Sequence, residues 1–585
     1  MEFKTLKHNL KKDTSEFSCF KFALLGDSAT QFLAIALKGW AIEKGFSADV
    51  FEAEYNQVER QIMDGNSELY SFDADYIIIF QSTHKLLSHY NKLSLNKQNT
   101  IADERLDFVK HIISVFSKKR QRIIYFNYPE IDDAVFGSFS NKIEFSFLYQ
   151  VRKINYELMK IAQSNANFFI CDIAAIQNKI GRDVMFSPSV YTSTEMVLSL
   201  DAIPIVASRA IDIVCAAQGA SKKCVILDLD NTLWGGVIGD DGIENIQLGH
   251  GLGIGKAFTE FQYWLKKLKL RGIILAVCSK NNENTAKEAF IKHPDMVLKL
   301  DDISVFVANW ENKADNIRHI QSILNIGFDS MVFIDDNPAE RDIVRKNILG
   351  ITVPELPQDP AEYLEYLYSL NLFESVAYSN ADAERTMQYQ VEAERALTRQ
   401  TFTNEGEFLK SLDMICEICC FDKFNTPRVA QLSQRSNQFN LRTVRYTDAD
   451  IAHIAADNSF KNFTFSLKDK FGDNGLVCVV ILKKEDAKTL FVETWFMSCR
   501  VLKRGMEHFV LNTITTFAKE NNFKEIIGEY IATSKNDMVK SHYLGLGFEP
   551  QKNDEDRNLF VLNVEKYQEK ECFIKSVYKE NITKI

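Results

Sequence analysis

Apolar runs of strand length alternate with longer helical segments through most of this sequence. Between residues 20 and 215 the runs FKFALLGDS, ADYIIIFQ, RIIYFNYP and NFFICDIAAI are separated by segments of helical periodicity, such as NKIEFSFLYQVRKINYELMKIA. The alternation returns between about 222 and 365, with VILDLD, GIILAVCSK and SMVFIDDNP. This pattern is typical of βαβ units that build a parallel sheet. The sequence therefore predicts two consecutive α/β blocks.

The remainder of the chain has a different pattern. Residues 366–405 are polar and helix-prone, which predicts a helical connector. Beyond it, the alternating runs GLVCVVILKK and TLFVETWFM lead into the helical segment GMEHFVLNTITTFAKE, which indicates an α+β block. A chain of 585 residues is too long for a single core. We expect domains at 1–220, 221–365 and 406–585, with the connector between the last two.

Composition excludes several classes of protein. Asp and Glu (79) outnumber Lys and Arg (69) and no basic block stands out, so we expect no nucleic-acid partner. No apolar run reaches the length of a membrane span and the N-terminus lacks the features of a signal peptide, which predicts a cytoplasmic protein with no membrane partner. The 11 cysteines are scattered, as is typical of reduced thiols. We interpret Cys416, Cys419 and Cys420 as strand thiols, because no second pair of zinc ligands lies nearby.

Carboxylate, hydroxyl and ammonium side chains follow the strands of the second block. In chain order they are Asp228, Asp230, Ser279, Lys313, Asp335 and Asp336. The carboxyl ends of adjacent parallel strands meet at one edge of a sheet, so we expect these side chains to converge. Carboxylates this dense raise one another's pKa unless a divalent cation neutralises them, and Mg²⁺ prefers oxygen ligands. The sequence therefore predicts a magnesium site formed by Asp228, Asp230, Asp335 and Asp336.

The residue types at this edge predict phosphoryl transfer. Asp228 would attack phosphorus as a carboxylate nucleophile, while Asp230 would protonate the leaving oxygen and later activate water. Ser279 and Lys313 would hold the transferring phosphoryl oxygens. The neighbouring polar residues expected to contact a small phosphorylated substrate are Asn231, Thr232 and Asn281.

Four segments of the second block resemble the motifs of one superfamily. DLDNTLWGG, CSKNN, ENKADN and FIDDNPAER are similar to motifs I to IV of the haloacid dehalogenase (HAD) superfamily, in particular its subfamily IIIC of FkbH-like proteins. The resemblance implies a Rossmann-like α/β domain that removes phosphate from 1,3-bisphosphoglycerate and passes the glyceryl group to the phosphopantetheine thiol of an acyl carrier protein. Only 51 positions separate Asp228 from Ser279 and 34 separate Ser279 from Lys313. This spacing predicts a site without a cap domain.

Cys278 directly precedes Ser279. A thiol beside Ser279, Lys280 and a metal would have a lowered pKa and would be able to carry the glyceryl group as a thioester. A small apolar residue at the end of a buried strand is the other interpretation. His250, in the glycine-rich LGHGLGIGK, is either a substrate contact or a loop histidine bonded to the backbone. Both questions remain open at this point.

The last block is similar to the GNAT acyltransferase fold. SLKDKFGDNGLV, WFMSCRVLKRGMEHFVL and SKNDMVKSHYLGLGFE carry the resemblance. In that fold a loop of pattern [QR]xxGx[GA] binds the pyrophosphate of coenzyme A at a helix N-terminus, and here Lys503 replaces the first glycine. The resemblance implies a site for phosphopantetheine, carried by coenzyme A or by the carrier protein. Its expected residues are Arg500, Arg504, Gly505, Asn536 and Tyr543. Polar residues of the preceding NTPRVAQLSQRSNQFN either contact substrate or cap and solvate a helix.

The first block resembles an SGNH hydrolase, a flavodoxin-like α/β fold. LLGDSAT is similar to the first block of that family, with Ser28 as the would-be nucleophile after Asp27. The DxxH segment expected near its end is CDIAAIQ, in which Ala175 follows Asp172 where the histidine would be. Without a base, Ser28 is a poor nucleophile. We therefore expect domain 1–220 to serve in scaffolding or docking, without hydrolase activity.

Three function classes remain. The first is a transferase that loads an acyl unit onto a carrier protein in secondary-metabolite or polysaccharide biosynthesis. The second is a plain magnesium phosphatase of a small phosphorylated metabolite, with a non-catalytic or acetyl-transferring GNAT domain. The third is a scaffold with inert sites, which the intact motif set argues against. Cys278, the absent cap and the pantetheine-type block favour the transferase.

Overall fold

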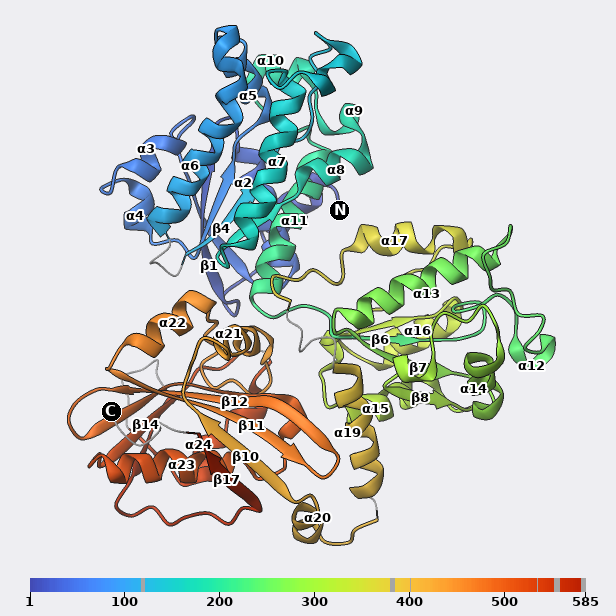
Figure 1. Cartoon of the computed structure of the whole chain (residues 1–585), viewed down its shortest axis with the longest axis vertical. Coiled ribbons are helices and arrows are strands. Elements are labelled where there is room, and N and C mark those ends of the chain that lie inside the picture. The colour runs from blue at the N-terminus through green and yellow to red at the C-terminus, as the bar shows by residue number, and fades with distance from the viewer. Residues whose placement is uncertain (117–120, 379–384, 400, 534, 552–557, 580–585) are drawn as a thin grey trace. The chain divides into compact units, whose positions relative to one another are not determined.

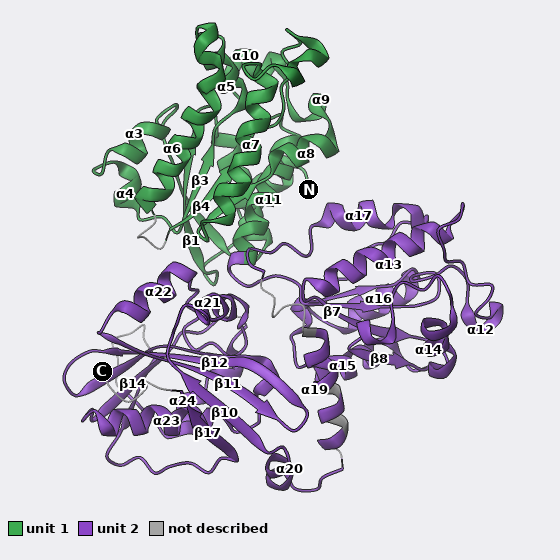
Figure 2. Ribbon diagram, viewed as in Figure 1, with its two compact units in different colours: residues 1–216 green, residues 217–585 purple. Residues whose placement is uncertain are grey.

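The computed structural model describes residues 1–116, 121–378, 385–399, 401–533, 535–551 and 558–579. The chain forms two compact units, Met1–Ala216 and Ala217–Ile585, which Figure 2 shows in different colours. The second unit contains two separate sheets, so the multidomain α/β architecture expected from the sequence is confirmed. None of the described helices combines the length and the apolar character that a membrane crossing requires.

The first unit is built on a five-stranded parallel sheet in the order β2-β1-β3-β4-β5. Figure 1 labels two of these strands, β1 and β4, and the helices around them. Its strands are β1 (Cys19–Gly26), β2 (Ser47–Glu52), β3 (Tyr76–Phe80), β4 (Arg122–Phe126) and β5 (Phe168–Cys171). Its helices are α1 (Phe3–Asn9), α2 (Gln31–Glu43), α3 (Val58–Met63), α4 (Glu68–Phe72), α5 (Thr83–Tyr90), α6 (Ile101–Phe116), α7 (Phe147–Gln163), α8 (Ile173–Ile180), α9 (Arg182–Met185), α10 (Pro188–Thr194) and α11 (Ala202–Ala217). Every residue of β3 is buried, as expected where both faces of a parallel sheet are covered.

A four-stranded parallel sheet follows, in the order β8-β7-β6-β9. Its strands are β6 (Cys224–Leu227), β7 (Ile274–Ser279), β8 (Val305–Ala308) and β9 (Met331–Ile334). Its helices are α12 (Ile238–Asp241), α13 (Gly255–Leu270), α14 (Glu283–Lys292), α15 (Lys313–Leu324), α16 (Pro338–Asn347) and α17 (Tyr363–Leu370). Successive residues of a strand point to opposite faces. Val277 therefore packs in the core with Leu265 of α13, whereas Cys278 packs on the other face with Ile317 of α15.

The last part of the second unit is an eight-stranded mixed sheet in the order β15-β16-β14-β13-β12-β11-β10-β17. Its strands are β10 (Met414–Cys419), β11 (Phe460–Asp469), β12 (Gly472–Lys484), β13 (Thr489–Met497), β14 (Glu525–Tyr530), β15 (Glu549–Pro550), β16 (Asn558–Asn563) and β17 (Ile574–Tyr578). Its helices are α20 (Glu405–Ser411), α21 (Thr426–Arg435), α22 (Asp448–Ala456), α23 (Met506–Glu520) and α24 (His542–Leu546). β10 to β13 pair antiparallel in sequence order, whereas β13 and β14 pair parallel with α23 between them in the chain. This is the α+β arrangement expected from the sequence.

The helical connector expected at 366–405 is only partly a separate segment. Its first residues belong to α17, residues 385–399 form α19 (Arg385–Arg399), and residues 379–384 and 400 lie outside the described residues. Arg395 of α19 forms an ion pair of 2.8 Å with Asp469 of β11, and both side chains are almost fully buried. Tyr389 of α19 packs in the core under the four-stranded sheet. The helix is thus part of the packed second unit.

Candidate active site

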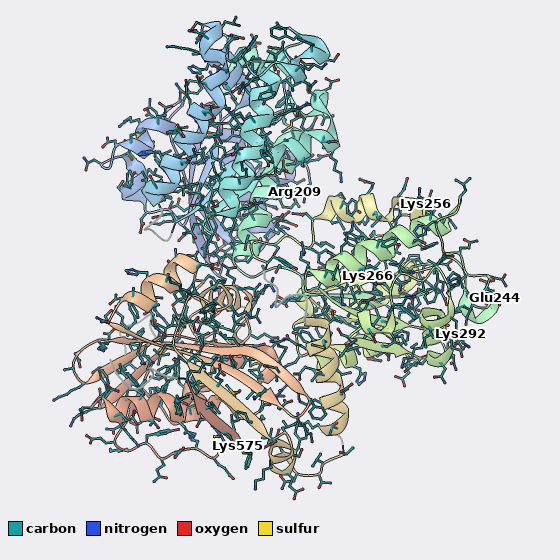
Figure 3. All side chains as sticks on the ribbon, viewed as in Figure 1. Arg209, Glu244, Lys256, Lys266, Lys292 and Lys575 are labelled. Atoms are coloured by element: carbon teal, nitrogen blue, oxygen red, sulfur yellow. The ribbon has the colours of Figure 1, made fainter. Side chains whose placement is uncertain are left out.

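Polar side chains gather where the strands of the four-stranded sheet end. Asp228 follows β6, Ser279 ends β7 and Asp335 follows β9, and all four strands run in the same direction. The main-chain N–H of Asp228 donates to the carbonyl of Ile334 (3.0 Å), which fixes the ends of β6 and β9 side by side. The convergence predicted from the sequence is therefore present. Figure 3 labels two lysines of α13, Lys256 and Lys266. Lys256 pairs with Glu260 on the surface (3.8 Å), whereas Lys266 pairs with the buried Asp302 (3.4 Å).

Three carboxylates form the centre of this site. Asp228, Asp335 and Asp336 each offer one oxygen, and these oxygens lie within 4.8 Å of one another. Burial, and after it the negative charge of Asp228, raise the pKa of Asp335 to about 6 against the opposing effect of Lys313. The pKa of Asp336 is also raised, by burial and then by Asp228. A close set of oxygen donors that repel one another fits a hard divalent cation such as Mg²⁺.

Lys313 lies between two of these acids. Its Nζ is 3.0 Å from Oδ1 of Asp228 and 2.6 Å from Oδ2 of Asp335. Burial lowers the pKa of Lys313, but the two carboxylates outweigh burial and raise it overall, so the side chain is an ammonium. Asn312 begins α15 by accepting the N–H of Ala314 (2.7 Å), which places Lys313 in the first turn of the helix. The site thus holds a fixed positive charge against its carboxylates.

Asp230 is held apart from the three-carboxylate group. Its Oδ1 accepts from the indole of Trp234 (2.9 Å) and the N–H of Ile238 (3.0 Å), and its Oδ2 accepts from Asn281 (2.8 Å). The metal set expected from the sequence had four members, and the structure brings together the side chains of three. Three donors instead fix the direction of the Asp230 carboxylate. Trp234 was not recognised from the sequence, although its position four residues after Asp230 in DLDNTLW was the available signal.

The turn after β6 is shaped by its own polar residues. Asn231 has a left-handed backbone (φ +52°), and its side-chain oxygen accepts the N–H of Gly236 (2.9 Å). The hydroxyl of Thr232, which is fully buried, accepts the N–H of Asp336 (3.1 Å). Both residues therefore hold the backbone around the acids. Their expected contact with substrate stays a prediction.

The end of β7 is connected to Asp230. The Asn281 amide donates to Asp230 and lies 3.4 Å from the hydroxyl of Ser279, which is 1% exposed. Lys280, between them, pairs with Glu340 at the start of α16 (2.6 Å). Ser279 and Asn281 thus lie at the same edge as Asp230, as predicted.

A nucleophilic thiol must be accessible to its substrate, and the thiol of Cys278 is not. Its side chain is fully buried in the core beneath α15, and its thiol lies 3.7 Å from the carbonyl of Lys313. Burial raises the pKa of Cys278 to about 12, although the Lys313 ammonium opposes the shift. The expectation of a lowered pKa is wrong. The reason is strand parity, because Cys278 points into the apolar face of β7 and not toward the polar edge.

The expected pantetheine residues of the last block are mostly buried. Arg504 pairs with Glu392 of α19 (2.6 Å) and Asp469 of β11 (3.1 Å). Asn536 is fully buried and donates to the carbonyls of Asn440 (3.0 Å) and Ile531 (2.9 Å). These two side chains therefore have strong contacts inside the protein.

The other three expected pantetheine residues lie in three different surroundings. Tyr543 is 1% exposed, packs against Phe560, and its hydroxyl has no hydrogen-bond partner among the described residues. Gly505 has φ +79° and immediately precedes α23. Arg500 lines a cavity of about 460 Å³ at the end of β13. Binding of pantetheine by this set stays a prediction.

In the first unit, Ser28 lies at the carboxyl end of β1. It is 2% exposed, and its hydroxyl has no hydrogen-bond partner among the described residues. The neighbouring Asp27 accepts the N–H of Ser82 with both oxygens (3.0 and 2.9 Å), and burial raises its pKa to about 6. Asp172 caps α8 by accepting the N–H of Ala175 (2.9 Å). Asp172 therefore has a structural role in this turn.

Comparisons with known proteins each match a part of the chain. Residues 21–215 match the family model of the FkbH N-terminal domain. A solved structure, the N-terminal part of the protein BF1531 from Bacteroides fragilis, contains a phosphatase domain complexed with Mg. It is 62% identical, covers 65% of this chain and 100% of its own, and aligns with a TM-score of 0.63.

Acetyltransferases align with about a quarter of the chain. The ribosomal-protein-S18-alanine N-acetyltransferase from Escherichia coli is 12% identical, covers 25% of this chain and 91% of its own, and has a TM-score of 0.20. A GNAT-family acetyltransferase from Staphylococcus aureus is 15% identical, covers 26% of this chain and 99% of its own, and has a TM-score of 0.22. A search of curated proteins found no match.

Proposed function

The chain belongs to the family of BF1531 from Bacteroides fragilis, and from this premise we propose that it is a magnesium-dependent phosphatase of the haloacid dehalogenase type. The observation that carries the proposal is the group of Asp228, Asp335 and Asp336 with the Lys313 ammonium between two of them. The relative's phosphatase domain is complexed with Mg. An oxygen-only donor set at the end of parallel strands fits the same ion.

The residues of the site divide the chemistry between them. Asp228, Asp335 and Asp336 would hold Mg²⁺, which when bound neutralises charge on the transferring phosphoryl group. An Asp228 oxygen bonds to phosphorus while the bond from phosphorus to the leaving oxygen breaks, and Asp230 gives its proton to that oxygen. Water then attacks the aspartyl-phosphate, Asp230 takes the water's proton, and phosphate leaves. Lys313 stabilises the negative charge of the phosphoryl group.

The hydrogen bonds around Asp230 prepare it for this role. Trp234, Ile238 and Asn281 direct donors at its two oxygens, so its orientation is set before substrate binds. Groups oriented in advance need little reorganisation during reaction. The side chain that exchanges protons is therefore held separately from those that would hold the metal.

We further propose that the enzyme loads a glyceryl unit from 1,3-bisphosphoglycerate onto an acyl carrier protein. The open carboxyl edge supports this, because between β7 and β8 the described chain holds only α14 and one short 3₁₀ helix and has no cap domain. The carrier thiolate attacks carbon 1, a C–S bond forms, the C–O bond to the acyl phosphate breaks, and inorganic phosphate leaves. Asp228 and Asp230 remove the second phosphate, the ester at carbon 3. Direct attack is preferred to a Cys278 relay, since that thiol is enclosed.

A second candidate is a plain phosphatase of a small phosphorylated metabolite, with a C-terminal domain that performs no chemistry. The burial of Arg504, Asn536 and Tyr543 favours this candidate, because these side chains already have partners or are enclosed in the core. Coenzyme A or carrier phosphopantetheine would then have no role in the reaction.

One experiment separates the two candidates. The full-length chain is incubated with Mg²⁺ and 1,3-bisphosphoglycerate, with and without a holo carrier protein. Released phosphate and the intact mass of the carrier are both measured. A carrier that gains one glyceryl mass supports loading. Phosphate release without a mass gain supports the plain phosphatase, and no release from any phosphorylated substrate tried would contradict both.

A further inference from the structure

A buried arginine holds the main chain between β9 and α16, where two of the three carboxylates of the candidate active site begin. Arg341, near the start of α16, is 5% exposed. Its Nη1 donates to the carbonyl oxygens of Asp335 (2.8 Å) and Asp336 (2.6 Å). Both bonds use main-chain oxygens, so they leave the carboxylates themselves to other partners. Arg341 thus fixes the peptide units that carry the two acids.

The other nitrogens of Arg341 face Glu355. Nε lies 3.2 Å and Nη2 lies 3.1 Å from the same carboxylate oxygen, Oε2. A guanidinium carries its N–H donors in a fixed plane, so binding at one edge sets the direction of the other. The carboxylate of Glu355 therefore orients the donor that reaches Asp335 and Asp336. A lysine carries its charge at a single point and would not make both sets of contacts.

Bonds from other residues hold the same turn. The N–H of Asp336 donates to the hydroxyl of Thr232 (3.1 Å), and the N–H of Asn337 donates to Oδ1 of Asp335 (2.8 Å). The acids of this edge repel one another, because oxygens of three carboxylates lie within 4.8 Å. A turn without such restraints would relieve the repulsion by letting the acids move apart. The group therefore needs a support that does not use up its carboxylate oxygens, and Arg341 supplies one.

We propose that Arg341 is a positioning residue that keeps Asp335 and Asp336 in the arrangement that binds Mg²⁺, and that Glu355 keeps Arg341 in place. The proposal rests on the magnesium site of the proposed function and names a residue on which that site depends. Charge alone predicts the opposite effect, because a nearby guanidinium repels a cation and its removal would strengthen binding. Support of the two acids predicts weaker binding when Arg341 is removed. The direction of the change therefore separates the two roles.

The test measures Mg²⁺ binding to the full-length chain by calorimetry, without substrate. Arg341→Met should weaken the affinity by roughly 10–100-fold, the range typical of residues that orient metal ligands. Arg341→Lys should also bind weakly, although it keeps the charge. Arg345→Met is the matched control, because Arg345 lies on the same helix and pairs with the same Glu355, while its other bond is to the carbonyl of Val353 (3.3 Å). This control should bind Mg²⁺ with wild-type affinity.

The two ways in which the proposal can fail are distinguishable. If Arg341→Met binds Mg²⁺ as tightly as wild type, or more tightly, the role of Arg341 is wrong while the magnesium site stands. If the wild-type chain binds no Mg²⁺, the magnesium site of the proposed function is wrong, and the role of Arg341 falls with it.

Hydrogen exchange of the metal-free chain in EDTA separates a local effect from a loss of the whole fold. In Arg341→Lys the N–H of Asp336 should exchange about tenfold faster than in wild type, because the turn is held less tightly. The N–H of Val225, in the middle of β6 between β7 and β9, should exchange at the wild-type rate. Unchanged exchange at Asp336 would overturn the proposal. Faster exchange at both sites would show that Arg341 supports the whole fold, which would overturn a specific role in positioning the acids.

Discussion

The Nζ of Lys313 lies 2.6 Å from Oδ2 of Asp335, and the two side chains are 3% and 0% exposed. Such a buried pair is costly to assemble, and removing one partner leaves the other charge buried without compensation. The same ammonium lies 3.0 Å from Asp228. The Lys313 side chain therefore supports both the fold of this edge and the chemistry proposed for it.

Replacement of Lys313 by Met should destabilise the protein strongly. The variant leaves Asp228 and Asp335 facing each other, and we expect the free energy of unfolding to fall by about 3–5 kcal/mol. Lys346→Met is the control, because that lysine is 72% exposed and its ion pair should contribute less than about 1 kcal/mol. Urea denaturation in EDTA measures both variants. Equal losses in the two would show that the buried pair contributes no more than a surface one.

Asp228→Asn should abolish phosphate release while the fold is kept. An amide cannot attack phosphorus and supplies no charge for a metal, so we expect the rate to fall by about a thousandfold or more. Phosphate release in the presence of Mg²⁺ is the measurement. Asp342→Asn, on the exposed face of α16, should release phosphate at the wild-type rate. Turnover by Asp228→Asn at that rate would mean that another group is the nucleophile.

Cys278→Ala should affect the reaction little. The thiol is buried in the core and its pKa is raised to about 12, so we expect both phosphate release and carrier loading to persist. The intact mass of the carrier and the yield of phosphate are measured together. A variant that releases phosphate but does not load the carrier would restore the thioester relay through Cys278.

Ser28→Ala should leave activity unchanged and cost no stability. The Ser28 hydroxyl is buried without a hydrogen-bond partner among the described residues, so its removal deletes no bond and relieves an unsatisfied polar group. Ser146→Ala is the contrasting variant, since Ser146 caps α7 by accepting the N–H of Tyr149 (3.3 Å) and should cost about 1 kcal/mol. Thermal unfolding compares the two. Loss of phosphate release in a folded Ser28→Ala variant would show that the hydroxyl takes part in function.

The stability of the first unit should depend on pH through Asp27. Its pKa is about 6 in the folded state and 3.8 as an ordinary carboxyl. Between these values the folded chain holds the proton and the unfolded chain has lost it, so stability falls as pH rises. The contribution is complete below about pH 4 and is lost above about pH 6, and it amounts to roughly 3 kcal/mol.

Asp27→Asn removes this titration. The free energy of unfolding of the variant minus that of wild type should therefore be larger at pH 7 than at pH 4. Amide hydrogen exchange in β1 and β3, compared at matched pH, reports the local stability. The same difference between variant and wild type at both pH values would contradict a raised pKa for Asp27.

The part of the site that the sequence predicted best is the set of polar residues that follow the parallel strands. Asp228, Ser279 and Asp335 each follow an apolar run, and parallel topology alone brings them to one edge. Cys278 was misjudged because nearness in sequence does not determine which face of a strand a side chain occupies. The contacts of Asp230 with Asn281, and of Arg504 with Asp469, join residues far apart in the chain. No local pattern encodes such contacts, so they required the three-dimensional structure.

The position of β9 beside β6 has a consequence for biosynthesis. A ribosome makes Asp228 about a hundred residues before Asp335 and Asp336, which at roughly 5–20 residues per second is a delay of several seconds. During that interval the growing polypeptide holds the proposed nucleophile, Asp228, but lacks the two acids that complete the proposed cation-binding group. A nascent or truncated chain that ends before β9 would therefore carry no working phosphatase, and catalytic competence would arrive only with the last strand of this sheet.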